Sequence, residues 1–225
     1  MKKTLACLAI FTLFSTLSVY SQHYNQFLDA YSYHTSMVNL NTKNANEYYD
    51  IEGSPYYNGG FNDAVVYLKD SSVVKMPLRY NIYGNKMEYK VNGINYEIAN
   101  PVAIDHIELG GALFIYVPGI QSGTYAEVLR SGNCQLVQKR AVRFEPSEGP
   151  KPVVGTITPA RFSPDPDTYY MIIKGGKPEK IYNIKSVLGA LTDQKAAVEE
   201  FIKKEKIRRA SRDNLLRIAD FYNSL

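Results

Sequence analysis

Tryptophan is absent from this chain, and cysteine and histidine are scarce, with two and three copies in 225 residues. One cysteine, Cys7, lies in an apolar stretch near the start, so a chain that has lost this stretch keeps only Cys134 and forms no internal disulfide. The motifs of serine hydrolases (G-x-S-x-G), zinc proteases (H-E-x-x-H) and P-loops are absent too. Recognisable catalytic signatures are therefore lacking.

A strong excess of one charge is also lacking. The chain has 26 basic and 22 acidic residues, and loss of Lys2 and Lys3 with a cleaved leader would leave 24 basic residues and a net charge of about +2. This balance argues against nucleic acid as a partner. No segment after residue 21 is apolar enough to span a membrane, so we expect no transmembrane segment once the leader is removed.

Residues 1–21 have the layout of a secretory signal peptide. Lys2 and Lys3 precede an apolar run, 5–17, that is shorter than the roughly 20 residues of a spanning helix. We expect cleavage between Ser21 and Gln22 and export to the periplasm, the cell surface or the medium. A retained membrane anchor is the alternative. A lipid anchor on Cys7 is not expected, because most of the apolar run follows that cysteine.

The rest of the chain predicts a mainly β, α+β fold. After a loosely ordered lead-in (22–62), residues 63–145 alternate strand-like runs with Gly, Asn and Ser turns every 8 to 12 residues, which predicts an antiparallel β-meander, as a curved sheet or an open barrel. A proline-rich irregular connection (146–168), a β-hairpin (169–183) and a C-terminal helical segment (184–225) follow. The expected strands cover 64–69, three runs within 77–98, 104–109, 112–117, 124–130 and 134–144.

The C-terminal helices are expected to be short and amphipathic. One follows Asn183. A second starts with Thr192 or Asp193 as its cap and a third with Ser211. Their buried faces are expected to hold Val198, Phe201 and Ile202 in the second helix, and Leu215, Ile218, Ala219 and Tyr222 in the third.

The stretch "PLRYNIYGNKMEYKVNGINYEI" (77–98) predicts strand register. Two-residue turns at Gly84-Asn85 and Asn92-Gly93 fix which residues face each other. They give three apolar rows on one face, and they place Arg79, Lys90 and Asn95 with Asn81, Glu88 and Glu97 on an exposed face. The expected apolar rows are Leu78-Val91-Ile94, Tyr80-Tyr89-Tyr96 and Ile82-Met87-Ile98.

Few polar side chains are candidates for a metal site or a catalytic nucleophile. His106 and Glu108 share a strand face and need a third ligand to bind zinc, so we expect no metal site. Asp105 and His106 are neighbours in a strand and are expected to point to opposite faces. Cys134 has no base in its sequence surroundings and is interpreted as a small buried residue, not a nucleophile.

The acidic residues of the strands provide the alternative to a non-catalytic function. Glu88 and Glu97 are expected cross-strand neighbours, and a carboxylate pair of this kind serves glycoside hydrolysis if it lies in a pocket. An exposed face bridged by Lys or Arg is the simpler interpretation. The basic run 203–209 is interpreted as a solvated helix end, with anionic headgroups or polysaccharide as alternative ligands.

Aromatic side chains are the remaining candidates for binding. Tyrosine, asparagine and glycine together suit adaptable contact surfaces for sugars or proteins, although they also suit ordinary strands and turns. The clusters "PYYNGGF" and "TYY" look exposed, and Tyr83 falls beside a turn on the charged face. The candidate binding residues are Tyr56, Tyr57, Phe61, Tyr83, Tyr169 and Tyr170.

The segments "EGSPYYNGGF", "MPLRYNIYGNKMEYK" and "LLRIADFYNSL" resemble a group of uncharacterised exported β-rich proteins of Bacteroidota. The resemblance covers most of residues 50–225. The group has no assigned activity, so the resemblance implies location and general build, and it implies no functional residue and no cofactor.

We therefore expect an exported, non-catalytic interaction or binding module, whose partner is an envelope protein or a glycan. A hydrolase that acts on a glycan or peptide through sheet carboxylates is the alternative. A structural role in an envelope complex is a third possibility, and the oligomeric state is open.

Overall fold

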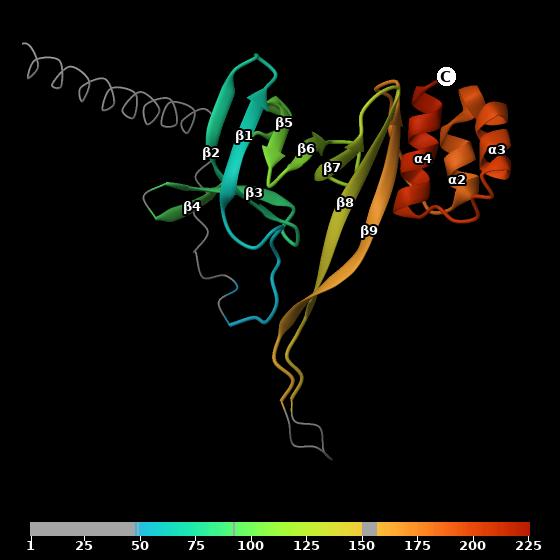
Figure 1. Cartoon of the computed structure of the whole chain (residues 1–225). Coiled ribbons are helices and arrows are strands. Elements are labelled where there is room, and N and C mark those ends of the chain that lie inside the picture. Colours follow the sequence, from blue (N-terminus) through green and yellow to red (C-terminus); the bar gives the residue numbers. More distant parts are fainter. Residues whose placement is uncertain (1–47, 49, 92, 150–156) are drawn as a thin grey trace, which may run out of the picture.

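The computed structural model describes residues 48, 50–91, 93–149 and 157–225 (Figure 1). The expected signal peptide and most of the expected lead-in, residues 1–47, therefore lie outside the described residues. The described helices all lack the combination of length and apolar character that crossing a bilayer requires.

In the described part of the chain, ten strands form one open antiparallel sheet in the order β10-β9-β8-β7-β6-β5-β1-β2-β3-β4. Two meanders, β1 to β4 and β5 to β10, are joined where β1 pairs with β5. The fold is thus mainly β, as the turn spacing predicts. The strands are β1 (Asn62–Leu68), β2 (Val73–Asn81), β3 (Lys86–Val91), β4 (Ile94–Glu97), β5 (Ile104–Leu109), β6 (Ala112–Val117), β7 (Thr124–Arg130), β8 (Cys134–Glu145), β9 (Arg161–Ile173) and β10 (Pro178–Ile181).

The register expected at the Asn92-Gly93 turn is confirmed. Val91 lies opposite Ile94, and Tyr89 lies opposite Tyr96. The two tyrosine rings stack with their centroids 5.6 Å apart. Gly93 has a φ of 82°, a backbone conformation that glycine adopts without a steric penalty.

The register expected at the Gly84-Asn85 turn is wrong by two residues. Leu78 lies opposite Tyr89 and Tyr80 opposite Met87, because the loop spans four residues, 82–85, and not two. A shift of two residues keeps every side chain on its expected face. The tyrosines therefore remain in the core, with Tyr80 1% and Tyr89 2% exposed.

The sheet curls so that the β2–β3 loop reaches the start of β7, and hydrogen bonds of the Asn85 side chain hold the two together. Its side-chain amide donates to the Gly123 carbonyl (2.9 Å), while its oxygen accepts from Thr124 Oγ1 (2.8 Å) and from the Tyr125 amide (3.0 Å). The Tyr80 hydroxyl also donates to the Tyr125 carbonyl (3.2 Å). The curl encloses the first core, whose centre includes Val66, Leu78, Tyr80, Met87, Tyr89, Ile107, Phe114 and Tyr125.

Three α-helices cover one face of the sheet at its β7–β10 end (Figure 1). They are α2 (Ile184–Ala190), α3 (Lys195–Lys204) and α4 (Arg212–Asn223). Asn183 caps α2 in a reciprocal capping box with Ser186. A 3-10 turn (Thr192–Gln194) precedes α3, so this helix starts later than expected.

The helix faces expected from the sequence are confirmed. Val198 and Ile202 of α3 are buried and Phe201 is half-buried. The four residues expected on the buried face of the last helix, Leu215, Ile218, Ala219 and Tyr222, are all buried. Together with Leu129, Cys134, Leu136 and Met171 from the sheet they form a second core.

Cys134 lies at the sheet side of this second core, with none of its surface exposed. Burial raises the pKa of the Cys134 thiol to about 12, because the thiolate loses its hydration there. The environment thus disfavours the thiolate, as the interpretation of a small buried residue requires.

We predict that this thiol makes the fold sensitive to alkali. The unfolded thiol ionises at a lower pKa than the folded one, so its contribution to stability is complete below pH 8 and is lost as the pH rises toward 12. Between pH 8 and pH 10, the free energy of unfolding should fall by about 1.4 kcal/mol more in the wild type than in Cys134→Val. Urea denaturation at the two pH values checks this. Equal losses in both proteins would contradict it.

The proline-rich stretch is more regular than expected. Residues 161–168 belong to β9 and pair with the end of β8, although Pro164 and Pro166 lie among them. The strand accommodates the prolines beside a bulge, where the register shifts between Lys139 and Ala141. The Asp167 carboxylate accepts the Ala141 amide (3.1 Å) at this bulge. The irregular connection is thus shorter than 146–168.

Candidate functional site

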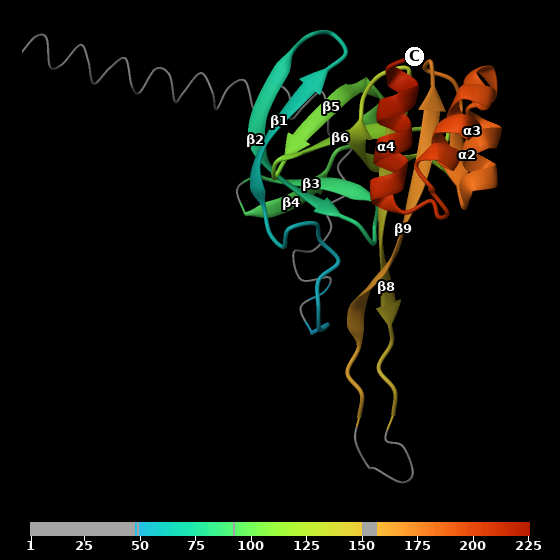
Figure 2. The same cartoon turned by 45° about the vertical axis from the view of Figure 1, so that its right-hand side comes forward.

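The β8–β9 hairpin extends beyond the rest of the sheet as an arm (Figure 2). We define the arm as residues 141–145 of β8 with 161–165 of β9, which pair throughout. Opposite residues share a face of an antiparallel pair, so Phe144 and Phe162 lie together on one face of the arm. The other face carries two opposed pairs, Arg143 with Ser163 and Glu145 with Arg161.

An aromatic patch forms where the arm leaves the body. The patch comprises Tyr48, Tyr56, Tyr83, Phe144 and Phe162. Its centre is Phe162, only 6% exposed, with ring centroids at 5.1 Å from Tyr48, 5.2 Å from Tyr83 and 5.5 Å from Phe144. These edge and tilted contacts are the arrangements that aromatic rings prefer.

Two members of the patch remain open to solvent. Tyr83 is 49% exposed and Phe144 is 38% exposed, and their ring centroids lie 6.3 Å apart. Tyr83 comes from the β2–β3 loop and Phe144 from the arm. Exposed aromatic rings that are already held in place lose little conformational entropy when a partner binds.

The polar face of β2 and β3 is largely covered, contrary to expectation, although Lys90 is exposed. Asn81 is 2% and Glu88 is 9% exposed, because residues 55–57 add to the end of β2 through Tyr57 amide to Tyr80 carbonyl (2.9 Å) and Ile82 amide to Pro55 carbonyl (2.8 Å). This segment carries aromatic rings over the polar face. The residues expected there as solvated charges are therefore partly buried.

Arg79 is enclosed between two of the candidate binding residues. Its guanidinium carbon lies 3.8 Å from the ring centroid of Tyr56 and 4.5 Å from that of Phe61. Arg79 also contacts Glu88 Oε2 at 2.5 Å, and Asn81 donates to the other oxygen of Glu88 (2.9 Å). Tyr56 and Phe61 thus stabilise a buried ion pair, and Tyr56 links that pair to the aromatic patch.

The other candidate tyrosines lie away from the patch. Tyr57 packs on Phe114 of the first core, and Arg140 lies over its ring at 4.7 Å. Tyr169 is half-buried beside the helices. Tyr170 is only 8% exposed and belongs to a small cluster on the opposite face of the sheet. The expectation that "TYY" is exposed is thus wrong for Tyr170.

The expected pair Glu88 and Glu97 lies directly across two strands. Each carboxylate has a cation as its partner, Arg79 for Glu88 and Lys86 for Glu97. The expected bridging by Arg and Lys is thus confirmed, whereas the expected exposure is wrong for Glu88. A hydrolase needs one carboxyl group free to give a proton, whereas a cation holds each carboxylate of this pair.

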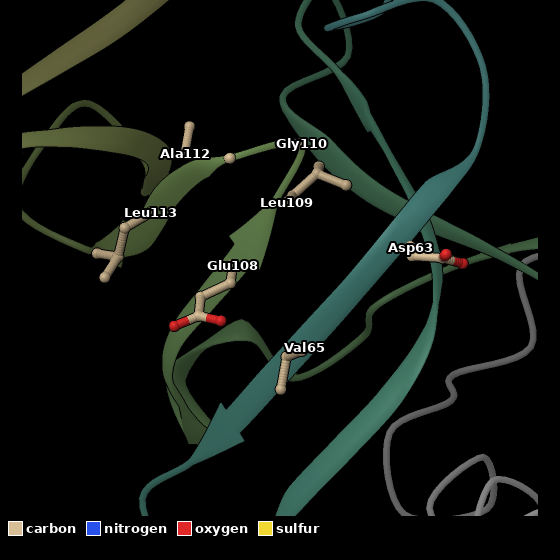
Figure 3. Close-up of a pocket in the computed structure, with 8 residues that line it drawn as sticks. Asp63, Val65, Glu108, Leu109, Gly110, Ala112 and Leu113 are labelled. Carbon is tan, nitrogen blue, oxygen red and sulfur yellow. The ribbon is translucent and has the colours of Figure 1, made fainter.

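A shallow pocket of about 380 Å³ lies at the β5–β6 turn (Figure 3). Asp63, Val65, Glu108 and Leu113 line it together with the Gly110-Gly111 turn. The two carboxylates point away from each other (Figure 3), so they do not converge on a common reacting atom. The pocket lacks the geometry of a glycoside hydrolase site.

Asp105 and His106 contact each other, contrary to the expectation from strand alternation. Asp105 Oδ2 lies 2.7 Å from His106 Nδ1. The pairing of β1 with β5 passes from Tyr67–His106 to Leu68–Ile104 and leaves Asp105 as the extra residue of a bulge. A bulge interrupts the alternation of side chains, which the sequence alone does not reveal.

Among the described residues, Asp105 and His106 have no neighbour that would complete a catalytic triad or a metal site. His106 stacks on Tyr67 with centroids 4.2 Å apart, and within the described residues no Ser, Thr or Cys side chain forms a hydrogen bond with its ring. In the same part of the chain, no group of three or more His, Cys, Asp or Glu side chains is arranged to hold a metal ion. The stack therefore has the character of a surface contact.

The basic run 203–209 has ion-pair partners nearby. Lys203 contacts Glu199 at 3.0 Å, Glu205 pairs with Arg217, and Ile207 is buried in the second core. These contacts fit a helix end that faces solvent on one side. No continuous basic surface is needed to explain the run.

Comparisons of the chain with protein-family models, with curated proteins and with solved structures give no match. The candidate site is therefore inferred from its own geometry. Sequence reasoning selected Tyr56 and Tyr83 but missed Phe144 and Phe162, because it did not predict that the end of β8 pairs with residues 161–165. Alternation of apolar and polar residues in "VRF" (142–144) and "RFSP" (161–164) is the signal that could have found them.

Proposed function

We propose that the protein is an exported, non-catalytic binding module that contacts an envelope protein or a glycan through the aromatic patch. The observation that carries this proposal is the pair of open rings, Tyr83 and Phe144, held against the buried Phe162. Rigid aromatic side chains at a surface are favoured in contacts with proteins and sugars. The arm contributes Phe144 and Phe162 to the patch, and it extends beyond the rest of the sheet (Figure 2).

Export is the second part of this proposal. It is supported by Lys2 and Lys3 ahead of the apolar run 5–17, and by the resemblance to exported proteins of Bacteroidota. Protein recovered from the cell envelope or the medium should start at Gln22.

Affinity capture from the native envelope tests the binding function. Tyr83→Ser should reduce the captured partner by about tenfold, because it removes an exposed anchor and leaves the core intact. Tyr182→Ser is the matched control, since Tyr182 is an exposed tyrosine, 71% exposed, outside the patch. Equal capture by both variants would contradict the proposal. Turnover of a glycan panel by the wild type would support the hydrolase instead.

A further inference from the structure

One edge of the arm has no strand beside it. β8 pairs with β7 only up to Gln138, whereas it pairs with β9 up to Glu145. From Val142 to Glu145, no other strand of the described chain lies along the outer edge of β8, and no backbone bond there is made to another described segment. An unpaired strand edge is a template for a further strand.

Two other edges of the sheet, those of β9 and β10, are protected. Along the arm, β9 contains Pro164 and Pro166 and is bridged by Glu52. At the end of the sheet, β10 has four residues and begins with Pro178. Prolines and short edge strands prevent strand addition. The segment 142–145 contains no proline, so it lacks the protection that the prolines give to β9.

We propose that this edge binds a second copy of the chain, through antiparallel pairing of two β8 strands about a twofold axis at Phe144. In such a pair, residues directly opposite each other share a face. Phe144 then lies opposite Phe144 of the second copy, and Arg143 lies opposite Glu145. The symmetry creates two pairs of opposite charge and one aromatic pair.

The neighbouring symmetric registers are worse. An axis at Arg143 puts two arginines opposite each other, and an axis at Glu145 puts two glutamates opposite each other, which is unfavourable in both cases. An axis between two residues would place neighbours such as Arg143 and Phe144 opposite each other. A twofold axis perpendicular to the sheet keeps each side chain on its own face, and opposite residues must share a face, so this register does not form. Among these three registers, the charges of the edge therefore favour the one at Phe144.

The charged face of the arm carries no net charge that would repel a second copy. Arg143 contacts Glu145 at 2.8 Å and Asp165 at 3.4 Å, and Arg161 contacts Glu145 at 2.5 Å. Two arginines are thus balanced by two carboxylates. Because the axis preserves the two faces, pairing places the aromatic patches of both copies on the same side. This inference goes beyond the proposed function and does not depend on the identity of its partner.

Charge exchange at the edge tests the proposal. Sedimentation velocity over a concentration series should show a dimer for the purified wild type. Arg143→Glu alone and Glu145→Arg alone place like charges opposite each other twice per dimer, and each should weaken dimerisation by about tenfold or more. An equimolar mixture of the two variants should restore the dimer, because every opposite pair is then complementary. If mixing restores the dimer, the single variants had lost the contact between copies and their arms were still folded.

Cross-linking gives a second measurement that does not depend on charge. A cysteine introduced by Phe144→Cys lies on the axis and should form a disulfide with its copy under mild oxidation, while Val142→Cys should not. A wild type that stays monomeric, variants that dimerise like the wild type, or a mixture that fails to restore the dimer would each overturn the proposal. The Tyr83→Ser variant should dimerise normally, so failure of this proposal is distinguishable from failure of the binding function.

Discussion

Asn85→Ala should lower the free energy of unfolding by about 2 to 4 kcal/mol. Asn85 joins the β2–β3 loop to the start of β7 through Gly123, Thr124 and Tyr125, with distances of 2.8 to 3.0 Å. Alanine leaves the Gly123 carbonyl and the Tyr125 amide without these partners, and unsatisfied groups in a partly buried site are costly. Chemical denaturation followed by circular dichroism measures the change.

Asn58→Ala is the matched control for this prediction. Both asparagines have a left-handed backbone, with φ of 51° for Asn58 and 52° for Asn85. Asn58 is exposed, so its replacement should cost about 1 kcal/mol at most, from the backbone alone. If the two variants lose equal stability, the side-chain hydrogen bonds of Asn85 contribute nothing beyond the effect of its backbone conformation. Asn85→Asp should be intermediate, since it keeps the acceptor and loses the donor.

The sequence predicts the regular parts of this fold because their side-chain periods are undisturbed. The strands 104–109, 112–117 and 124–130 have the bounds that alternation and glycine turns predict. The helix 212–223 likewise buries the four residues that its period selects. In these elements the local pattern and the tertiary packing agree.

The missed features depend on local irregularities of one or two residues. A four-residue loop at 82–85 shifts the β2–β3 register, and the bulge at Asp105 brings two neighbouring side chains together. The bulge at Lys139 and Ala141 lets a strand with two prolines continue the arm. Distant contacts, such as those of Asn85 with β7, decide these irregularities, so local periodicity does not predict them.

The sequence predicts only part of the aromatic patch, for the same reason. Tyr56 and Tyr83 were selected by composition and turn position, and they lie in the patch. Phe144 and Phe162 join them only through the pairing of β8 with β9. Tyr170 looked similar in sequence but lies in a strand with a covered face. Exposure of an aromatic residue depends on which face of its strand is covered, and that requires the topology.

Arg140→Met should lower the free energy of unfolding by about 2 to 4 kcal/mol. Arg140 donates from Nε to Glu127 Oε2 at 2.8 Å and also lies over the Tyr57 ring. The Glu127 side chain is only 11% exposed, so loss of the arginine leaves a buried carboxylate without its cation. An uncompensated buried charge costs more than the pair contributes. Urea denaturation at neutral pH gives the value.

Two controls separate the buried charge from lost packing. The double variant Glu127→Gln, Arg140→Met removes both charges and should recover half of the loss, about 1 to 2 kcal/mol. Arg130→Met removes an arginine from a surface pair with Asp220, whose side chains are 43% and 52% exposed, and should cost less than about 1 kcal/mol. If the double variant is as unstable as Arg140→Met, the loss arises from the stacking on Tyr57. If Arg130→Met costs as much as Arg140→Met, burial of Glu127 is not what makes the pair important.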